Sequence, residues 1–188
     1  MSRSSVCNYG CFSDKEEVQV DTKPRKIRVV PLILAVCLPL LVGCFSAFLT
    51  ADDMKLYDTM NKPPLAPPGW LFPIVWTILY AAMGVASYLV FASYYGPLRK
   101  WIALKFYFTQ LAMNMFWPIL FFTYGRYLLS FVWLLVMWVE ILICAIKFYK
   151  VNKAAGFMMC GVFLWTTFAA YLNLAYYIMS ITPAMLGD

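Results

Sequence analysis

Residues 62–91 read KPPLAPPGWLFPIVWTILYAAMGVASYLVF, a proline-rich segment followed by a long apolar run. Each proline fixes its own φ angle and lacks a backbone donor, so the four prolines before residue 70 predict a stiff, non-helical segment. No side chain from Gly69 to Gly96 carries a charge. This run is longer than the roughly 20 residues that cross a hydrocarbon core about 30 Å thick. The stretch therefore predicts a membrane-spanning helix with a rigid lid before it.

The composition of the whole chain is that of a membrane protein. Of its 188 residues, 63% are hydrophobic and only 13% are charged, far outside the range of soluble globular proteins. Backbone groups inside a bilayer must form their hydrogen bonds within the protein, so only helices or a closed barrel can span it. The long apolar runs lack the two-residue alternation of barrel strands. We predict an all-α integral membrane protein.

Breaks between apolar runs predict a five-transmembrane-helix bundle over residues 29–188. Gly96-Pro97 is expected to end the second helix and Thr182-Pro183 the fifth, while Pro118 should kink the far end of the third. The predicted helices occupy residues 29–49, 70–94, 101–122, 127–148 and 155–181, and a lid loop occupies residues 50–69.

The basic residues predict the orientation of this bundle. Residues 1–28 are polar, have no apolar core near their start and are expected to form a disordered tail, not a cleaved signal. If five helices cross the membrane, twelve of the fifteen lysines and arginines lie on the side of this tail. That bias predicts a tail on the cytoplasm-like side and a lid on the other. Because these residues form no single stripe, the charge of +6 indicates a lipid membrane as partner and no nucleic acid.

The absence of histidine from the sequence excludes much familiar chemistry. Imidazole general bases, histidine metal sites and histidine haem ligands are impossible. The six cysteines include no C-x-x-C pair and require neither a disulfide nor a metal site. Glu140 is the only acid well within a predicted span, and without a second acid or a histidine relay a proton pump is not expected.

Polar side chains mark one face of the third predicted helix. Gln110 and Asn114 are four residues apart and Trp117 follows three further on, so all three project from the same face. A buried amide in hydrocarbon needs a partner, so this face should point into the bundle. Two interpretations stay open, which are hydrogen bonding between helices and contact with a ligand.

Two further helices present aromatic stripes. Trp165, Ala169 and Asn173 recur every four residues in the fifth predicted helix, as do Trp76 and Tyr80 in the second. Aromatic stripes in membrane helices usually serve packing or interfacial belts. If the stripes face one another, they would instead line a flat apolar cavity with a few polar anchors.

Several motifs resemble the translocator protein family, also called tryptophan-rich sensory proteins or peripheral benzodiazepine receptors. The resemblance covers roughly residues 41–181. The motifs are GCF at residues 43–45, KP-x-x-x-PP-x-W at 62–70, VW-x-x-LY-x-x-MG-x-x-SYLV at 75–90, QLA-x-N-x-x-WP at 110–118 and W-x-x-FA-x-x-LN at 165–173.

This resemblance implies a five-helix bundle whose first loop folds over a cavity that binds tetrapyrroles such as protoporphyrin and haem. In animal members it also implies binding of sterols and drug-like molecules, and a mitochondrial outer membrane location, with the endoplasmic reticulum or plasma membrane as alternatives. The implied ligand-binding residues are Trp70, Gln110, Asn114, Trp117, Trp165, Ala169 and Asn173, supported by Trp76 and Tyr80 and covered by the lid prolines Pro63, Pro64, Pro67 and Pro68.

The sequence departs from the family pattern at identifiable positions. Leu65 and Met115 stand where the family has tryptophans in the loop and in the third helix. The family's sterol motif requires a basic residue after the tyrosines of the last helix, but none follows Tyr176 and Tyr177. The departures favour binding over photochemistry, because they reduce the aromatic surface.

The leading hypothesis is a membrane receptor of the translocator type that binds tetrapyrroles, with sterols as further candidate ligands, no obligatory cofactor and no catalytic residues. One alternative is a light-dependent porphyrin-degrading enzyme with Trp70 or Trp165 as electron donor. Others are a sterol or lipid transporter and a scaffold whose aromatic stripes only pack. Ala82 and Ala86 form an A-x-x-x-A pattern that would permit a homodimer.

Overall fold

The computed structural model describes residues 27–57 and 62–186, except for the side chains of residues 55, 56 and 183–186. The expected disordered tail falls on residues 1–28, of which 1–26 lie outside the described residues. In chain order the helices are α1 (Val29–Leu49), α2 (Ala51–Tyr57), α3 (Leu71–Phe91), α4 (Pro97–Pro118), the π-helix η1 (Ile119–Thr123), α5 (Tyr127–Val151) and α6 (Lys153–Leu186).

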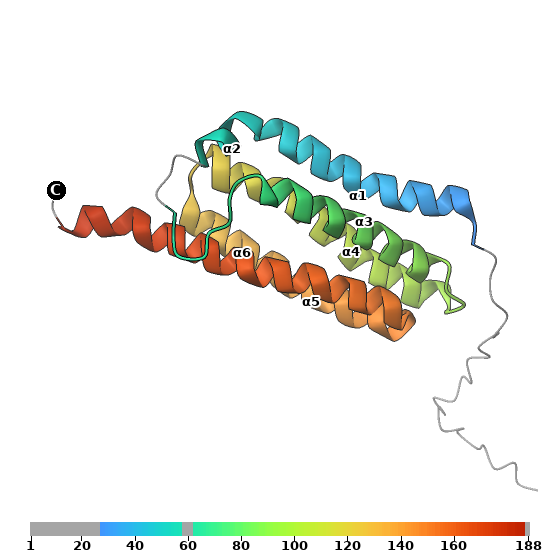
Figure 1. Ribbon diagram of the computed structural model, residues 1–188. Helices are drawn as coiled ribbons and strands as arrows, with labels where there is room; N and C mark the ends of the chain where they lie inside the picture. Colours follow the sequence, from blue (N-terminus) through green and yellow to red (C-terminus); the bar gives the residue numbers. More distant parts are fainter. Residues whose placement is uncertain (1–26, 58–61, 187–188) are drawn as a thin grey trace, which may run out of the picture.

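The five long helices lie side by side in one elongated bundle (Figure 1). Their contacts close a ring in the order α1, α3, α6, α5, α4, because α1 packs against both α3 and α4. Large apolar side chains from α3, α4, α5 and α6 fill the middle of the bundle and are fully buried. They include Met83, Tyr107, Leu134, Met137, Ile141, Phe148, Met159 and Val162.

Four helices are long and apolar enough to cross a membrane, namely α1, α3, α5 and α6. This confirms the prediction of an all-helical, multi-pass integral membrane protein. The fifth long helix, α4, has 22 residues but carries Arg99, Lys100 and Lys105 near its start and is less apolar. The predicted count of five membrane-spanning helices therefore depends on whether α4 also crosses the membrane.

The helix ends differ from the predicted ones where prolines are involved. Pro97 begins α4 instead of only ending the helix before it, because a proline in the first helical turn needs no donor there. At the other end of the chain, α6 continues through Thr182-Pro183 to Leu186. A proline inside a helix removes one backbone hydrogen bond, and membrane helices tolerate this loss. The second predicted helix does end before Gly96-Pro97, at Phe91, but the third begins at Pro97 instead of residue 101, and Thr182-Pro183 does not end the last helix.

Pro118 changes the type of helix that follows it. The α-helical hydrogen bonds of α4 end at this proline, and η1 continues the chain as a π-helix, closed by the backbone N of Tyr124, which donates to the carbonyl of Ile119 (3.0 Å). The predicted disturbance at Pro118 thus takes the form of a π-helical turn, a feature that often accompanies functional sites.

The predicted lid loop contains a helix that sequence patterns did not indicate. Residues 51–57 form α2, and the hydroxyl of Thr123 in η1 donates to the carboxylate of Asp53 in α2 (2.6 Å). The backbone N of Ala66 donates to the carbonyl of Pro63 (3.1 Å), and Leu65 lies in this turn with a positive φ of 67°. The lid is therefore a short helix followed by a proline-rich turn.

Two tyrosine hydroxyls attach the proline-rich turn to neighbouring helices. Tyr171 of α6 donates to the carbonyl of Pro64 (2.8 Å), and Tyr57 of α2 donates to the carbonyl of Pro67 (3.2 Å). Pro63 and Pro67 are buried, whereas Pro64 and Pro68 are exposed. Because prolines cannot donate, their carbonyls are the groups through which the lid is held.

Candidate functional site

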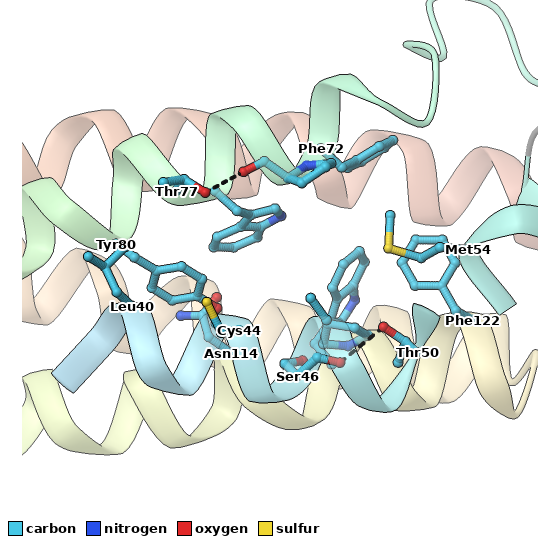
Figure 2. Close-up of a pocket in the computed structure, with 16 residues that line it drawn as sticks. Leu40, Cys44, Ser46, Thr50, Met54, Phe72, Thr77, Tyr80, Asn114 and Phe122 are labelled. Carbon is cyan, nitrogen blue, oxygen red and sulfur yellow. Dashed lines mark hydrogen bonds between the residues drawn. The ribbon is translucent and has the colours of Figure 1, made fainter. Parts of the chain in front are cut away.

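A cavity of about 460 Å³ lies between α1, α2, α3 and α4, and we call it the main cavity. This volume falls within the range of small-molecule sites. Leu40 and Tyr80 lie towards one end of it, and Met54 and Phe122 lie towards the other (Figure 2). Its wall consists of Leu40, Gly43, Cys44, Ser46, Ala47, Thr50, Met54, Phe72, Pro73, Trp76, Thr77, Tyr80, Asn114, Trp117, Pro118 and Phe122.

Two glycines let α1 and α3 pack closely beside the main cavity. A Cβ atom on Gly84 of α3 would lie only 2.5 Å from the Cα of Val36 in α1. A Cβ atom on Gly43 of α1 would meet the ring of Tyr80 in α3. The ring of Tyr80 therefore lies over Gly43, where it also contacts Trp76 with ring centroids 5.3 Å apart. These contacts place both aromatic side chains in the cavity wall.

The serine and threonine hydroxyl groups in the wall are occupied by main-chain carbonyls. Thr50 donates to the carbonyl of Ser46 (3.1 Å) and Thr77 donates to that of Pro73 (2.7 Å), as the dashed lines in Figure 2 show. Ser46 itself donates to the carbonyl of Met115 in α4 (3.0 Å). Because these donors are already used, the wall offers an apolar surface to a bound molecule.

Asn114 is the polar exception in the wall. Its Nδ2 donates to the backbone carbonyl of Gln110 (3.0 Å) and to Oε1 of Gln110 (2.8 Å), which uses both amide protons. Its Oδ1 is buried and has no partner among the described residues. Gln110 is fully buried behind it and lies outside the cavity lining. Gln110 therefore orients Asn114, a lining residue, so that its acceptor is left unpaired and covered beside the cavity.

The main cavity opens between α1 and α3. Cys44 and Ala47 of α1 line it and are exposed, as are Pro73 and Thr77 of α3. Both helices meet the length and apolarity of membrane spans. The open side of the cavity therefore faces the region that lipid tails occupy.

A second, nearly filled space lies next to the main cavity, between α2, α3, η1 and α6. It holds about 10 Å³, close to the minimum volume that a single water needs, about 10–15 Å³. We call it the second space, and it is lined by Tyr57, Phe72, Trp117, Phe121, Phe122, Ala169, Leu172, Asn173 and Tyr176. Phe72, Trp117 and Phe122 belong to both linings.

The sequence-predicted site residues separate between these two spaces. Trp76, Tyr80 and Asn114 line the main cavity. Ala169 and Asn173 line the second space, and Trp117 lies between the two. The structure thus brings the α3 and α4 residues together and leaves the α6 residues behind a layer of aromatic rings.

Asn173 serves as a hydrogen-bonding link between helices. It is fully buried and pairs with the hydroxyl of Ser130 in α5. The hydrogen bonds of Asn173 are best satisfied when the oxygen and nitrogen of its side-chain amide exchange places. In that orientation the oxygen accepts from Nε1 of Trp117 (3.1 Å) and the nitrogen donates to the carbonyl of Tyr127 (2.9 Å). Asn173 thereby joins α4, α5 and α6 and holds the indole of Trp117 in the wall.

The remaining predicted residues lie outside both linings. Trp165 packs behind Phe72, with ring centroids 6.1 Å apart, and Trp70 is 64% exposed at the start of α3. The four lid prolines, Pro63, Pro64, Pro67 and Pro68, also lie outside the linings, although Thr50 and Met54 from the predicted lid range do line the main cavity.

Sequence reasoning missed the α1 side of the main cavity. Gly43, Ser46, Ala47 and Thr50 all line it. They follow one another at spacings of three, one and three residues, so they lie on one helix face. Small residues on one face of a helix whose other residues are mostly large and apolar are the sequence signal that would have identified the α1 side of the main cavity.

These features define the chain as a helical membrane protein with an apolar cavity inside its bundle. The chain matches the TspO/MBR family over residues 35–179 and belongs to that family. The tryptophan-rich protein TspO of Chlorobaculum tepidum is 31% identical over 157 residues, which cover 83% of this chain and 98% of that protein.

Other relatives come from bacteria and animals. The tryptophan-rich sensory protein of Cereibacter sphaeroides is 34% identical over 142 residues, covering 74% of this chain and 87% of that protein. The translocator protein of Homo sapiens is 33% identical over 135 residues, covering 70% of this chain and 80% of that protein. The similarity therefore spans the membrane bundle and confirms the family resemblance of the motifs.

Proposed function

We propose that this chain is a membrane receptor or translocator-type protein that binds a tetrapyrrole, such as protoporphyrin or haem, in the main cavity. Sterols and other apolar molecules are further ligands in this proposal. The observation that carries it is the main cavity itself, an apolar space of about 460 Å³ whose lining includes Asn114, a residue with a covered and unpaired acceptor. Small-molecule sites typically combine an apolar lining with a few such polar anchors.

Aromatic side chains supply the surface on which a flat ligand would stack. Phe72, Trp76, Tyr80 and Trp117 come from α3 and α4 and all line the main cavity. Their rings favour offset or edge contacts with another aromatic system. Because the sequence has no histidine, apolar burial and ring contacts would hold a porphyrin, with no imidazole on its metal.

The ligand would reach the cavity from the bilayer. The open side lies between α1 and α3, where Cys44, Ala47, Pro73 and Thr77 are exposed at membrane depth. Tetrapyrroles and sterols partition into lipid because burial of apolar surface is favourable. Such a molecule need not pass the proline-rich turn to bind.

In this proposal α4 is the fifth membrane span. It has 22 residues and packs against α1 and α5, both of which are long and apolar enough to cross a membrane. Lys105 is exposed, so its ammonium group could extend towards the membrane surface. The mitochondrial outer membrane is the location that the resemblance to animal members implies.

The porphyrin-degrading alternative gains no support from the geometry. Trp70 is largely exposed, and Trp165 lies behind Phe72, so neither predicted electron donor lines the main cavity. A receptor function needs only the cavity, so it is the function that the site supports best.

The proposal is tested by blocking the main cavity from its exposed rim. In purified protein, protoporphyrin should quench tryptophan fluorescence saturably. Ala47→Phe places a ring at the lining and should weaken the apparent affinity by about ten-fold or more, because the ring occupies ligand volume.

Leu41→Phe is the matched control for this experiment. Leu41 is exposed on the same helix but lies outside the lining, so its substitution should leave quenching unchanged. A wild-type protein without saturable quenching, or equal affinities for Ala47→Phe and wild type, would contradict the proposal.

A further inference from the structure

We infer that Tyr57 determines the size of the ligand that this chain accepts, because its ring fills the space that would otherwise extend the main cavity towards α6. This inference rests on the proposed function, since it concerns ligands of the same cavity. In the structure Tyr57 closes the second space and contacts Phe72 and Phe122 of the layer that separates it from the main cavity, so its withdrawal would give these two rings room to turn aside and join the spaces.

A single layer of side chains separates the two spaces. Phe72 of α3, Trp117 of α4 and Phe122 of η1 line the main cavity on one side and the second space on the other. None of the long helices needs to move for the spaces to merge, because aromatic rings alone form the division. The second space is therefore positioned as an extension of the main cavity.

The ring of Tyr57 occupies most of that extension. Tyr57 is only 1% exposed and contacts Phe72, Phe122 and Tyr176, with ring centroids 5.4, 6.0 and 5.9 Å away respectively. About 10 Å³ remains beside it. Loss of a large buried side chain can open a void on the order of 150 Å³, enough for a benzene-sized group.

Tyr57 comes from α2, the shortest α-helix among the described residues. It ends α2, which has only 7 residues, too few for a helix that is stable alone. The hydrogen bond from Tyr57 to the carbonyl of Pro67 and that from Thr123 to Asp53 connect α2 to its surroundings. The other side chains of the second space belong to long helices or to η1. Withdrawal of α2 is thus the movement that opens the second space while the packing of the long helices stays intact.

This arrangement accounts for the separation of the predicted ligand residues. Ala169 and Asn173 line the second space and lie beyond the aromatic layer in the closed arrangement. A small ligand would fit the main cavity alone and would not contact them. A ligand as large as a tetrapyrrole would require Tyr57 to withdraw, and its apparent affinity would be reduced by the population of the open state.

The test uses two ligands of different size and two substitutions at one position. In the full chain, Tyr57→Ala should raise the affinity for protoporphyrin by about ten-fold, because the open state no longer has to be reached. Tyr57→Phe keeps the ring but loses the hydrogen bond to Pro67, so it should raise the affinity for protoporphyrin much less than Tyr57→Ala does. The small neutral dye N-phenyl-1-naphthylamine should bind all three proteins equally, since it needs only the main cavity.

A double-mutant cycle identifies the space that Tyr57 closes. Ala169→Leu, which fills the second space from α6, should weaken protoporphyrin binding when made alone and should cancel the gain from Tyr57→Ala. An unchanged or reduced protoporphyrin affinity in Tyr57→Ala would overturn the inference, as would a gain that persists with Ala169→Leu. If Ala169→Leu does not fold, the contrast between Tyr57→Ala and Tyr57→Phe still decides it.

Failure of the inference can be distinguished from failure of the proposed function. If Ala47→Phe abolishes binding of both ligands while Tyr57→Ala changes neither, the cavity binds ligands but Tyr57 does not limit their size. If Ala47→Phe leaves both ligands bound, the main cavity is not the site, and the inference fails with the proposed function.

Discussion

Asn114 shows how one side chain can give an apolar cavity chemical selectivity. Both amide protons of Asn114 are used by Gln110, so its buried Oδ1 can only accept a hydrogen bond. A bound molecule whose N–H or O–H group displaces the cover of this atom would satisfy it, whereas one without a donor would leave it unpaired. Buried unpaired acceptors are costly, so the cavity should favour ligands with a donor.

This selectivity can be measured with a pair of dyes. N-phenyl-1-naphthylamine, which has an N–H group, should bind wild type more tightly than its N-methyl derivative, by about 1 kcal/mol or roughly five-fold. Asn114→Leu should remove the difference. Thr77→Val, which alters another lining residue whose hydroxyl already donates to Pro73, should preserve it. Equal loss of the difference in both variants would contradict the role of Asn114.

The packing of α1 against α3 depends on the absence of a side chain at Gly84. A Cβ atom there would meet backbone atoms of Val36 and Ala35, which cannot move aside without moving α1. Gly84→Ala should therefore destabilise the protein by about 1–3 kcal/mol, as overpacking does. Thermal unfolding in detergent measures this loss.

Gly161 provides the matched comparison for Gly84. A Cβ atom at Gly161 in α6 would meet only Cδ2 of Leu79, at the ordinary contact distance of 3.9 Å. Gly161→Ala should be neutral or stabilising, because alanine is favoured over glycine in helices by about 1 kcal/mol. Similar losses of stability in both variants would indicate that helix packing at Gly84 is not the cause.

The opening between α1 and α3 can be tested with the native cysteines of the chain. Cys37, Cys44 and Cys160 are exposed, but of these only Cys44 lines the main cavity. In reconstituted membranes an apolar maleimide should label Cys44, and saturating protoporphyrin should suppress this labelling. Cys37 lies two turns along the same face of α1 and should be labelled equally with and without ligand. Protection of both cysteines, or of neither, would contradict access between these helices.

At the scale of elements, the sequence predicted the long helices better than the lid. The α1 helix occupies the predicted residues 29–49, because its ends follow from an apolar run bounded by charges. The α2 helix was not predicted, since seven residues carry too little periodic signal and their helical state depends on contacts such as that between Asp53 and Thr123. Tertiary packing therefore decides the part of the lid that adjoins the cavity.

The same distinction explains which site residues could be predicted. Asn114 and Trp117 stand out because polar and indole groups are costly in hydrocarbon without partners. Gly43 and Ala47 do not stand out individually, and only their position opposite α3 makes them a wall. The placement of Ala169 behind Phe72 depends on where α2 inserts Tyr57, which residue spacing within one helix does not indicate.

At the scale of the whole molecule, the bundle divides into a scaffold and a ligand-binding side. The α5 and α6 helices make the most extensive contact in the protein and contribute nothing to the lining of the main cavity. The main cavity lies beside α1, which closes the ring of helices and lines the cavity with the small residues Gly43, Ser46 and Ala47. Ala86 of the A-x-x-x-A pattern is fully buried within the chain and therefore serves internal packing, whereas Ala82 is partly exposed.

The proposal that α4 spans the membrane makes a definite prediction for the connections at its two ends. Gly96 precedes α4 and Tyr124 follows η1, and both are exposed, as is Lys153 at the start of α6. With α4 and α5 both crossing, positions 96 and 153 lie on one side of the membrane and position 124 lies on the other. Without an α4 crossing, positions 96 and 124 would share a side.

Single cysteines at these positions distinguish the two topologies. Gly96→Cys is suitable because a Cβ atom there meets nothing within 4 Å, and Tyr124→Cys and Lys153→Cys replace exposed side chains. In sealed vesicles of one orientation, a membrane-impermeant maleimide should label positions 96 and 153 together and leave position 124 unlabelled, or the reverse. Permeabilised vesicles should be labelled at all three. Matching accessibility of positions 96 and 124 in sealed vesicles would exclude α4 as a span, and with it the predicted concentration of basic residues on one side.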